Sequence, residues 1–140
     1  VLVKGNNQLV SIAVEGKVSE PFDKYVYEWK LRSGKGKARR LKFLCDKLQL
    51  ETNKVDHIRY QLLHRTASAI MGAEEFKAEN ALMLVHSFSQ SDEWFEDYKQ
   101  FLNLFGLKDI RPDSIIYAKN IAGIDLYFGW VRGEKKYLDK

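Results

Sequence analysis

The 140-residue sequence has little of what marks secreted or membrane-spanning proteins. Its single cysteine, Cys45, excludes an internal disulfide and favours a reducing compartment. The longest uninterrupted apolar run, residues 81–85, is too short to cross a bilayer. The amino-terminal VLVKGNN lacks the charged start and apolar middle of a signal peptide. We therefore expect a cytoplasmic protein without a membrane partner.

Several familiar catalytic signatures are also missing. No serine lies in a GxSxG turn, and Cys45 falls at the apolar spacing of a helix core, so a serine or cysteine hydrolase is poorly supported. One cysteine and three scattered histidines do not match the ligand spacing of a zinc site. The sequence has neither a glycine fingerprint for dinucleotides nor a GxxxxGK[ST] phosphate-binding loop. A carboxylate-bound divalent metal is the chemistry that remains.

The composition is that of one folded domain. Hydrophobic residues make up 45% of the chain and charged residues 30%, an ordinary globular balance, and no repeat or linker divides residues 1–140. The net charge of +4 permits nucleic-acid binding without requiring it. The sequence has no initiator methionine and its first residues already have strand character. We expect a single domain that lacks its native amino-terminal part.

Hydrophobic periodicity predicts an α/β fold with a central mixed β-sheet flanked by helices, in the order β-β-α-α-α-β-α-β-β. The nearly all-apolar segment 81–88 is typical of a central strand covered on both faces. The other expected strands are 1–4, 9–18, 115–119 and 124–132. Helices are expected around Phe22 to Trp29, over 38–50, from an N-cap at Asp56, and from an N-cap at Ser91 to Gly106.

The pair Glu15 and Lys17 stands at the end of an otherwise apolar strand. Alternation places both side chains on one face, with Val14 and Gly16 on the other. An ion pair on a solvated strand end would explain this pattern. A divalent-cation site would also explain it, because Mg²⁺ and Mn²⁺ prefer oxygen ligands and a lysine beside them can orient water or neutralise charge developing on phosphorus. In that interpretation Glu15 is a metal ligand, and Glu15 and Lys17 are catalytic.

Two further groups of polar residues could serve a nucleic-acid site. Residues 30–42 hold seven Lys and Arg and no acid, which is typical either of a solvated face or of a flexible loop and helix that contact a phosphate backbone. On the helix expected after Asp56, a polar stripe carries side chains that donate and accept hydrogen bonds in defined directions. The stripe comprises His57, Gln61, His64, Arg65 and Ser68. The predicted substrate contacts are Lys35, Lys37, Arg39, Arg40, His64 and Arg65.

Three segments, in this order, resemble a known superfamily. They are VEGKVSEPF, RYQLLHRTASAI and LMLVHSFS, and together with the preceding hairpin they are similar to a small bacterial family assigned to the PD-(D/E)xK, restriction-endonuclease-like superfamily. The resemblance covers most of residues 1–105 and implies a single nuclease-like domain that uses Mg²⁺ or Mn²⁺ on DNA or RNA. It also implies that Gln61, in an arrangement with Arg65 where tyrosine is often found, lines the site as a third catalytic residue that positions water or phosphate.

The sequence departs from this pattern at one position that matters. The superfamily places an acidic residue on the strand before the (D/E)xK motif, but residues 1–14 contain no Asp or Glu. Either an aspartate lies one or two residues before Val1, or Glu20 substitutes, or the site is degenerate. The first hypothesis is a metal-dependent phosphodiester hydrolase; the alternative is a catalytically silent nuclease-like domain that binds nucleic acid or a protein partner. The basic run could also be no more than a solvated face.

Overall fold

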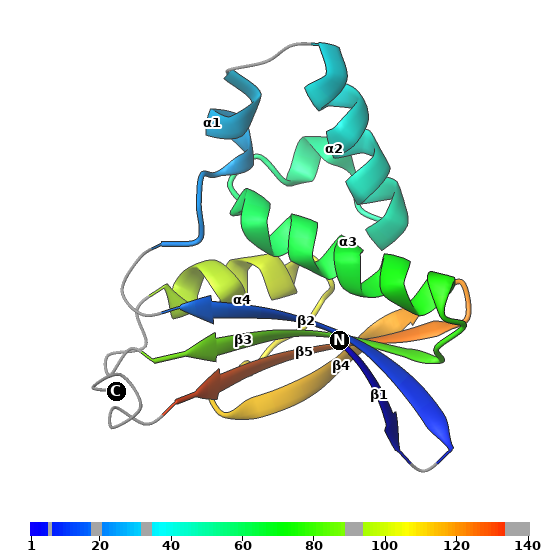
Figure 1. Ribbon diagram of the computed structural model, residues 1–140. Coiled ribbons are helices and arrows are strands. Elements are labelled where there is room, and N and C mark those ends of the chain that lie inside the picture. Colours follow the sequence, from blue (N-terminus) through cyan, green and yellow to red (C-terminus); the bar gives the residue numbers. More distant parts are fainter. Residues whose placement is uncertain (6, 18–20, 32–34, 89–93, 134–140) are drawn as a thin grey trace.

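The computed structural model describes residues 1–5, 7–17, 21–31, 35–88 and 94–133 and forms an α/β fold (Figure 1). The strands are β1 (Leu2–Gly5), β2 (Gln8–Lys17), β3 (Asn80–Ser87), β4 (Ser114–Ile121) and β5 (Ile124–Arg132). The helices are α1 (Val26–Leu31), α2 (Lys35–Leu48), the 3-10 helix η1 (Thr52–Lys54), α3 (Tyr60–Glu75) and α4 (Phe95–Asn103).

The sheet is five-stranded and mixed, with the order β1-β2-β3-β5-β4. The β2–β3 and β3–β5 pairs are parallel, whereas β1–β2 and β4–β5 are antiparallel hairpins, as the sequence predicts for both ends of the chain. Ala122 and Gly123 have φ values of 50° and 91°, and the Asn120 side chain accepts a hydrogen bond from the Gly123 amide. The β4–β5 turn is therefore closed by the residue types that the sequence offers there.

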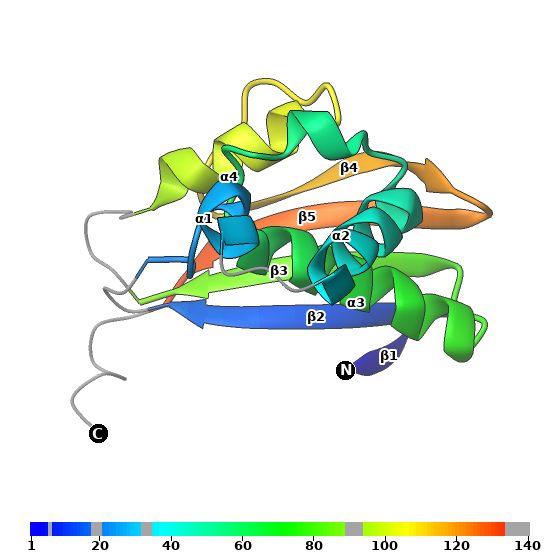
Figure 2. The same cartoon turned by 90° about the horizontal axis from the view of Figure 1, so that it is seen from above.

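The described helices all lie on one face of the sheet (Figures 1 and 2). Inward-facing positions of the central strands, such as Met83, Val85 and Phe128, are fully buried against this layer. On α2, the predicted stripe of Leu41, Leu44, Cys45 and Leu48 is buried as its spacing requires. No described helix lies on the second face, so the structure confirms the predicted cover of β3 on one face only.

Three helix starts differ from the prediction. Helix α1 begins at Val26 rather than at Phe22. Helix α2 begins at Lys35, so most of the described basic run is helical rather than loop. Helix α3 begins at Tyr60 after the extended residue Arg59, and Asp56 does not cap it. Asp56 forms an ion pair with Lys30 instead, at 2.6 Å, which ties α1 to the segment before α3. His57 therefore precedes the helix and does not belong to its polar stripe, and its ring lies against Tyr27.

An ion pair with low solvent exposure fixes α4 against the start of α3. Arg59 Nε lies 2.9 Å from Asp97 Oδ2, both side chains are 11% exposed, and Arg59 also donates to the Asp23 carbonyl. Its guanidinium lies 3.8 Å from the Tyr25 ring centroid. This contact adds cation–π attraction to the ion pair. The predicted cap Ser91 lies outside the described residues, and α4 begins at Phe95.

Candidate functional site

Strand β2 places Glu15 and Lys17 on the helix-covered face of the sheet. Glu15 is paired with Val85 of β3, and Glu15 and Lys17 are 8% and 6% exposed. The alternation that puts Ser11 and Ala13 toward α3 carries the same orientation to the end of the strand. The solvated strand-end interpretation is wrong, because both charges are buried under the helical layer.

Three donors surround the Glu15 carboxylate. Gln61 Nε2 donates to Glu15 Oε1 at 2.6 Å, and Arg65 Nε donates to Glu15 Oε2 at 2.6 Å. Lys17 Nζ lies 3.5 Å from Glu15 Oε1. Each oxygen of the carboxylate is thus held by a side chain from another position, and hydrogen bonds to a charged acceptor are among the stronger ones in proteins.

Helix α3 supplies the two partners from one face. Gln61 and Arg65 are four residues apart and therefore lie one turn from each other on the side of α3 that contacts Glu15 of β2. The structure thus brings together three predicted catalytic residues and one predicted substrate contact. Their proposed chemical roles stay predictions.

Lys17 has two further contacts besides Glu15. Its ammonium donates to the Pro21 carbonyl at 3.3 Å and lies 5.2 Å from the centre of the Phe22 ring. These contacts hold the cation in a shielded position behind the carboxylate. Gln61 Oε1, in contrast, is buried and has no hydrogen-bond partner among the described residues. A buried oxygen without a partner lowers the stability of the fold, and it is available to accept a hydrogen bond from a ligand or water.

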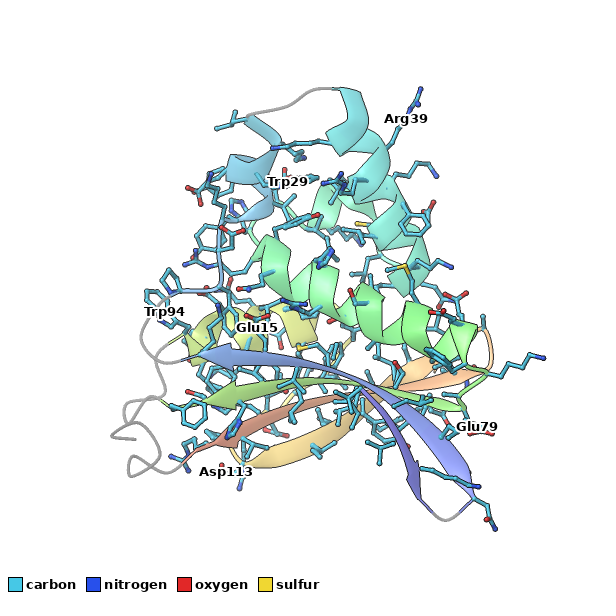
Figure 3. All side chains as sticks on the ribbon, viewed as in Figure 1. Glu15, Trp29, Arg39, Glu79, Trp94 and Asp113 are labelled. Atoms are coloured by element: carbon cyan, nitrogen blue, oxygen red, sulfur yellow. The ribbon has the colours of Figure 1, made fainter. Side chains whose placement is uncertain are left out.

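The predicted basic contacts divide into two groups. Arg40 hydrogen-bonds the Tyr60 hydroxyl and interacts with His64. Arg39, in contrast, is exposed and points away from Glu15 (Figure 3). Lys37 donates to the Trp29 carbonyl at 2.9 Å and lies over the Trp29 ring, so it has a structural role.

Lys35 begins α2, but its side chain lies outside the described part of the structure. Among the predicted substrate contacts, Arg65 therefore binds Glu15, and His64 lies where the charges of Arg65, Arg40 and Glu15 act on it.

The pKa of His64 is lowered from its ordinary value. Partial burial is the largest cause, and the positive charges of Arg65 and Arg40 add to it, while Glu15 acts in the opposite direction. His64 is therefore neutral at pH 7. An anion bound between these cations would offset their repulsion and favour the protonated imidazole.

A divalent cation does not fit the described side chains. They provide one carboxylate, whose oxygens both accept hydrogen bonds, and two cations within 3.5 Å of it. Among the residues that the structure describes, no group of three or more His, Cys, Asp or Glu could hold a metal ion. Glu20 lies outside the described residues, and the acidic residue expected before Val1 stays a prediction. One carboxylate opposed by Lys17 and Arg65 falls short of the oxygen donor set that Mg²⁺ requires.

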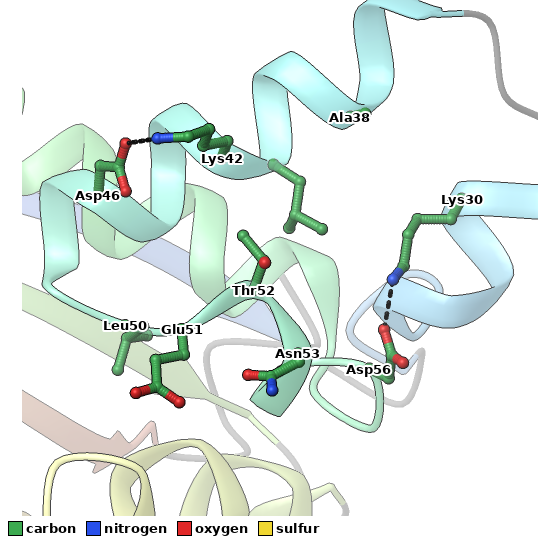
Figure 4. Close-up of a pocket in the computed structure, with 10 residues that line it drawn as sticks. Lys30, Ala38, Lys42, Asp46, Leu50, Glu51, Thr52, Asn53 and Asp56 are labelled. Atoms are coloured by element: carbon green, nitrogen blue, oxygen red, sulfur yellow. Dashed lines mark hydrogen bonds and ion pairs between the residues drawn. The ribbon is translucent and has the colours of Figure 1, made fainter.

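Two features around the site were not predicted from the sequence. The Tyr60 ring stacks on Trp29 at 4.3 Å, which ties the start of α3 to α1 and positions Arg40 beside His64. A cavity of about 800 Å³ lies between α1, α2 and η1, bordered by the Lys30–Asp56 ion pair (Figure 4). None of the predicted site residues lines this cavity. The spacing of the aromatic residues is a weak sequence signal for the stacking of Tyr60 on Trp29. The cavity has no such signal, because it depends on the chain reversal at η1.

Comparisons with known proteins give a family without an assigned activity. No described helix has the length and apolar character needed to span a membrane. No curated protein and no solved structure was found to match the chain. A family model described as a domain of unknown function, DUF6946, matches residues 1–135. Because this match covers nearly the whole chain, the protein belongs to the DUF6946 family.

Proposed function

We propose that this protein is a restriction-endonuclease-like domain that binds the phosphate backbone of nucleic acid without a metal ion. The observation that carries this proposal is the complete engagement of Glu15 by Gln61, Arg65 and Lys17. Because Lys17 and Arg65 together carry one more positive charge than Glu15 carries negative charge, the cluster keeps a net positive charge that can attract an external anion.

The balance of charge around Glu15 supports an anionic ligand. Glu15 carries one negative charge, whereas Lys17, Arg65 and Arg40 carry three positive charges, and His64 can add a fourth when it protonates. The Arg65 side chain is 43% exposed, so its guanidinium is accessible to a ligand. Guanidinium groups suit phosphate oxygens because their donors form a planar fork.

Fluorescence anisotropy with labelled single-stranded DNA, duplex DNA and RNA tests this proposal. We expect binding in EDTA that weakens steeply between about 50 and 200 mM salt, because each phosphate contact releases counterions. Arg40→Glu should weaken binding far more than Arg39→Glu, since Arg40 lies beside His64 and Arg39 points away. Salt-independent binding, or equal effects of the two variants, would contradict the proposed surface.

The second candidate is metal-dependent phosphodiester hydrolysis, and the unpaired Gln61 oxygen beside Glu15 favours it. This candidate needs a second carboxylate. In the β1–β2 register Leu2 pairs with Ser11, so the third position before Val1, if β1 continues there, lies opposite Glu15. An acidic residue at that position in the encoded chain would support hydrolysis.

Cleavage assays separate the two candidates. In the hydrolase, Mg²⁺ or Mn²⁺ would start cleavage of a labelled substrate, and Glu15→Ala and Lys17→Ala would abolish it. In the binding domain, neither metal would start cleavage, and EDTA would leave the affinity unchanged. Arg39→Ala is the matched control, because that exposed side chain lies away from Glu15 (Figure 3).

A further inference from the structure

The sheet face opposite the helices has no described element on it (Figure 1), and its central positions are mostly apolar. Alternation and register place the side chains of β2, β3 and β4 there in adjacent rows, with Val14 opposite Leu84 and Leu84 opposite Gly129. Ile115 of β4 completes this row beside Gly129. We call this surface the open face; its members include Ile12, Val14, Leu82, Leu84, Ile115 and Tyr117.

The exposed area on the open face is large for side chains of this type. Val14, Ile115 and Tyr117 are 45%, 58% and 48% exposed. A β-carbon added at Gly129 would lie 2.9 Å from Leu84 Cδ1 and 3.1 Å from Ile115 Cγ1, so these two side chains close over the glycine. The centre of the open face is therefore filled by aliphatic groups rather than hollowed into a ligand pocket.

The composition of the central strand requires a cover on this side. Strand β3 is apolar at positions that face the helices, Met83 and Val85, and equally at Leu82 and Leu84, which face away. Because β3 pairs in parallel with both neighbours, it belongs to the part of a sheet that proteins normally bury on both faces. Exposed apolar surfaces of this extent mark interaction sites.

We propose that the open face binds the open face of a second copy of this chain, in a two-fold symmetric dimer. The six side chains named above carry no charge, so no like charges oppose each other at these positions although each chain has a net charge of +4. Asp125, at one end of this face, is held by the Tyr117 hydroxyl at 3.3 Å and the Asn120 amide at 3.0 Å. A nucleic acid would find no cation among these six positions, whereas an identical aliphatic surface matches them.

The area of the face agrees with a reversible dimer. Four strands of about eight residues, spaced about 4.8 Å apart with about 3.3 Å per residue, have a footprint of roughly 500 Å². Two such faces bury on the order of 1,000 Å² as footprint and more as accessible surface, which is the lower end of specific interfaces. Sheets pack face to face at about 10 Å, a distance that aliphatic side chains of this size fill. We therefore expect a dissociation constant in the micromolar range.

Sedimentation equilibrium tests the dimer. Chain concentrations from about 1 to 200 μM bracket a dissociation constant in the micromolar range. The mass should rise with concentration from 16.3 kDa to twice that value. The double variant Val14→Lys with Ile115→Lys should stay at the mass of one chain and keep the wild-type circular dichroism. Leu31→Lys is the matched control, because Leu31 is 80% exposed on α1 and away from the open face, and it should dimerise like the wild type.

A charge-swap experiment separates loss of the interface from loss of folding. The double variant Val14→Glu with Ile115→Glu should be monomeric alone. It should associate when it is mixed with the double variant Val14→Lys with Ile115→Lys. A wild type that stays monomeric over the whole range would overturn the proposal. In that case a dye for exposed apolar surface shows whether the face is bare or covered by the chain itself. Equal dimerisation of the wild-type and double-Lys chains would overturn it as well.

Discussion

Replacement of Glu15 by glutamine should destabilise the fold, because this carboxylate neutralises a buried cation. The substitution keeps the volume and one hydrogen bond to Gln61, but it removes the negative charge beside Lys17, which is 6% exposed. Removing one partner of a buried ion pair costs about 3–5 kcal/mol. Arg65 adds little, since its half-exposed side chain can return to water at about 0.2–1 kcal/mol. We expect a loss of about 3 kcal/mol in the free energy of unfolding.

Lys17→Met should cost less, about 1 kcal/mol, because Glu15 keeps its hydrogen bonds to Gln61 and Arg65 while the methionine still packs on Phe22. The double variant should therefore lose less stability than the two single variants together, with a coupling on the order of 1 kcal/mol. Urea unfolding followed by tryptophan fluorescence and far-ultraviolet circular dichroism measures the free energy of unfolding of the two single variants and of the double variant.

Glu96→Gln is the matched control for this cycle. The Glu96 side chain is 77% exposed and pairs with Lys99 on the surface, so the substitution should change the free energy of unfolding by less than about 0.5 kcal/mol. If Glu15→Gln behaved like Glu96→Gln, the Glu15 carboxylate would not be neutralising a buried charge. The proposal of an internally satisfied centre would then be refuted.

Three further predictions concern other parts of the molecule. Burial raises the pKa of the Cys45 thiol to about 11. A thiol reagent should therefore leave the native protein unlabelled at pH 8 and label one site per chain after unfolding; rapid native labelling would contradict this core position. Arg59→Lys should cost about 1–2 kcal/mol in urea unfolding, because lysine cannot donate to both Asp97 and the Asp23 carbonyl as the guanidinium does, and it loses the stacking on Tyr25. Because the pKa of His64 is lowered, the unliganded protein loses stability as pH falls below about 6.5, where the unfolded chain protonates first. Nucleic-acid binding should strengthen over the same interval, and His64→Gln should flatten the pH profile of affinity; an unchanged profile would show that His64 does not face the ligand.

The two hairpins and the buried face of α2 could be predicted from the sequence, because residues close together in the chain determine them. Turn residues between alternating segments predict the two hairpins, and the three- and four-residue spacing of Leu41, Cys45 and Leu48 predicts the buried face of α2. Helix starts were less accurate, because Asp56 is engaged by Lys30 across a tertiary contact that no local pattern contains. His57 does not belong to the predicted polar stripe for a related reason, because α3 begins only at Tyr60.

For the candidate site, strand alternation was enough to place Glu15 and Lys17 on one face of the sheet. That both are buried, and that Gln61 and Arg65 hold the carboxylate, depends on where α3 packs across β2. The position of Arg40 relative to His64 likewise follows from the packing of α2 on α3, where Arg40 hydrogen-bonds the Tyr60 hydroxyl. Long-range packing of this kind leaves no fixed spacing in the sequence.

The sequence by itself determined the residue types of this protein and their periodicity: the ExK pair, the basic run, and a central strand that is apolar on both faces. Only the tertiary structure decided how these features are used. It closes Glu15 within three donors, brings Arg40 and Arg65 near His64, and leaves one face of the sheet open. The physical reason is that side-chain chemistry is local, whereas solvent exposure and charge pairing are set by the elements that pack on each face.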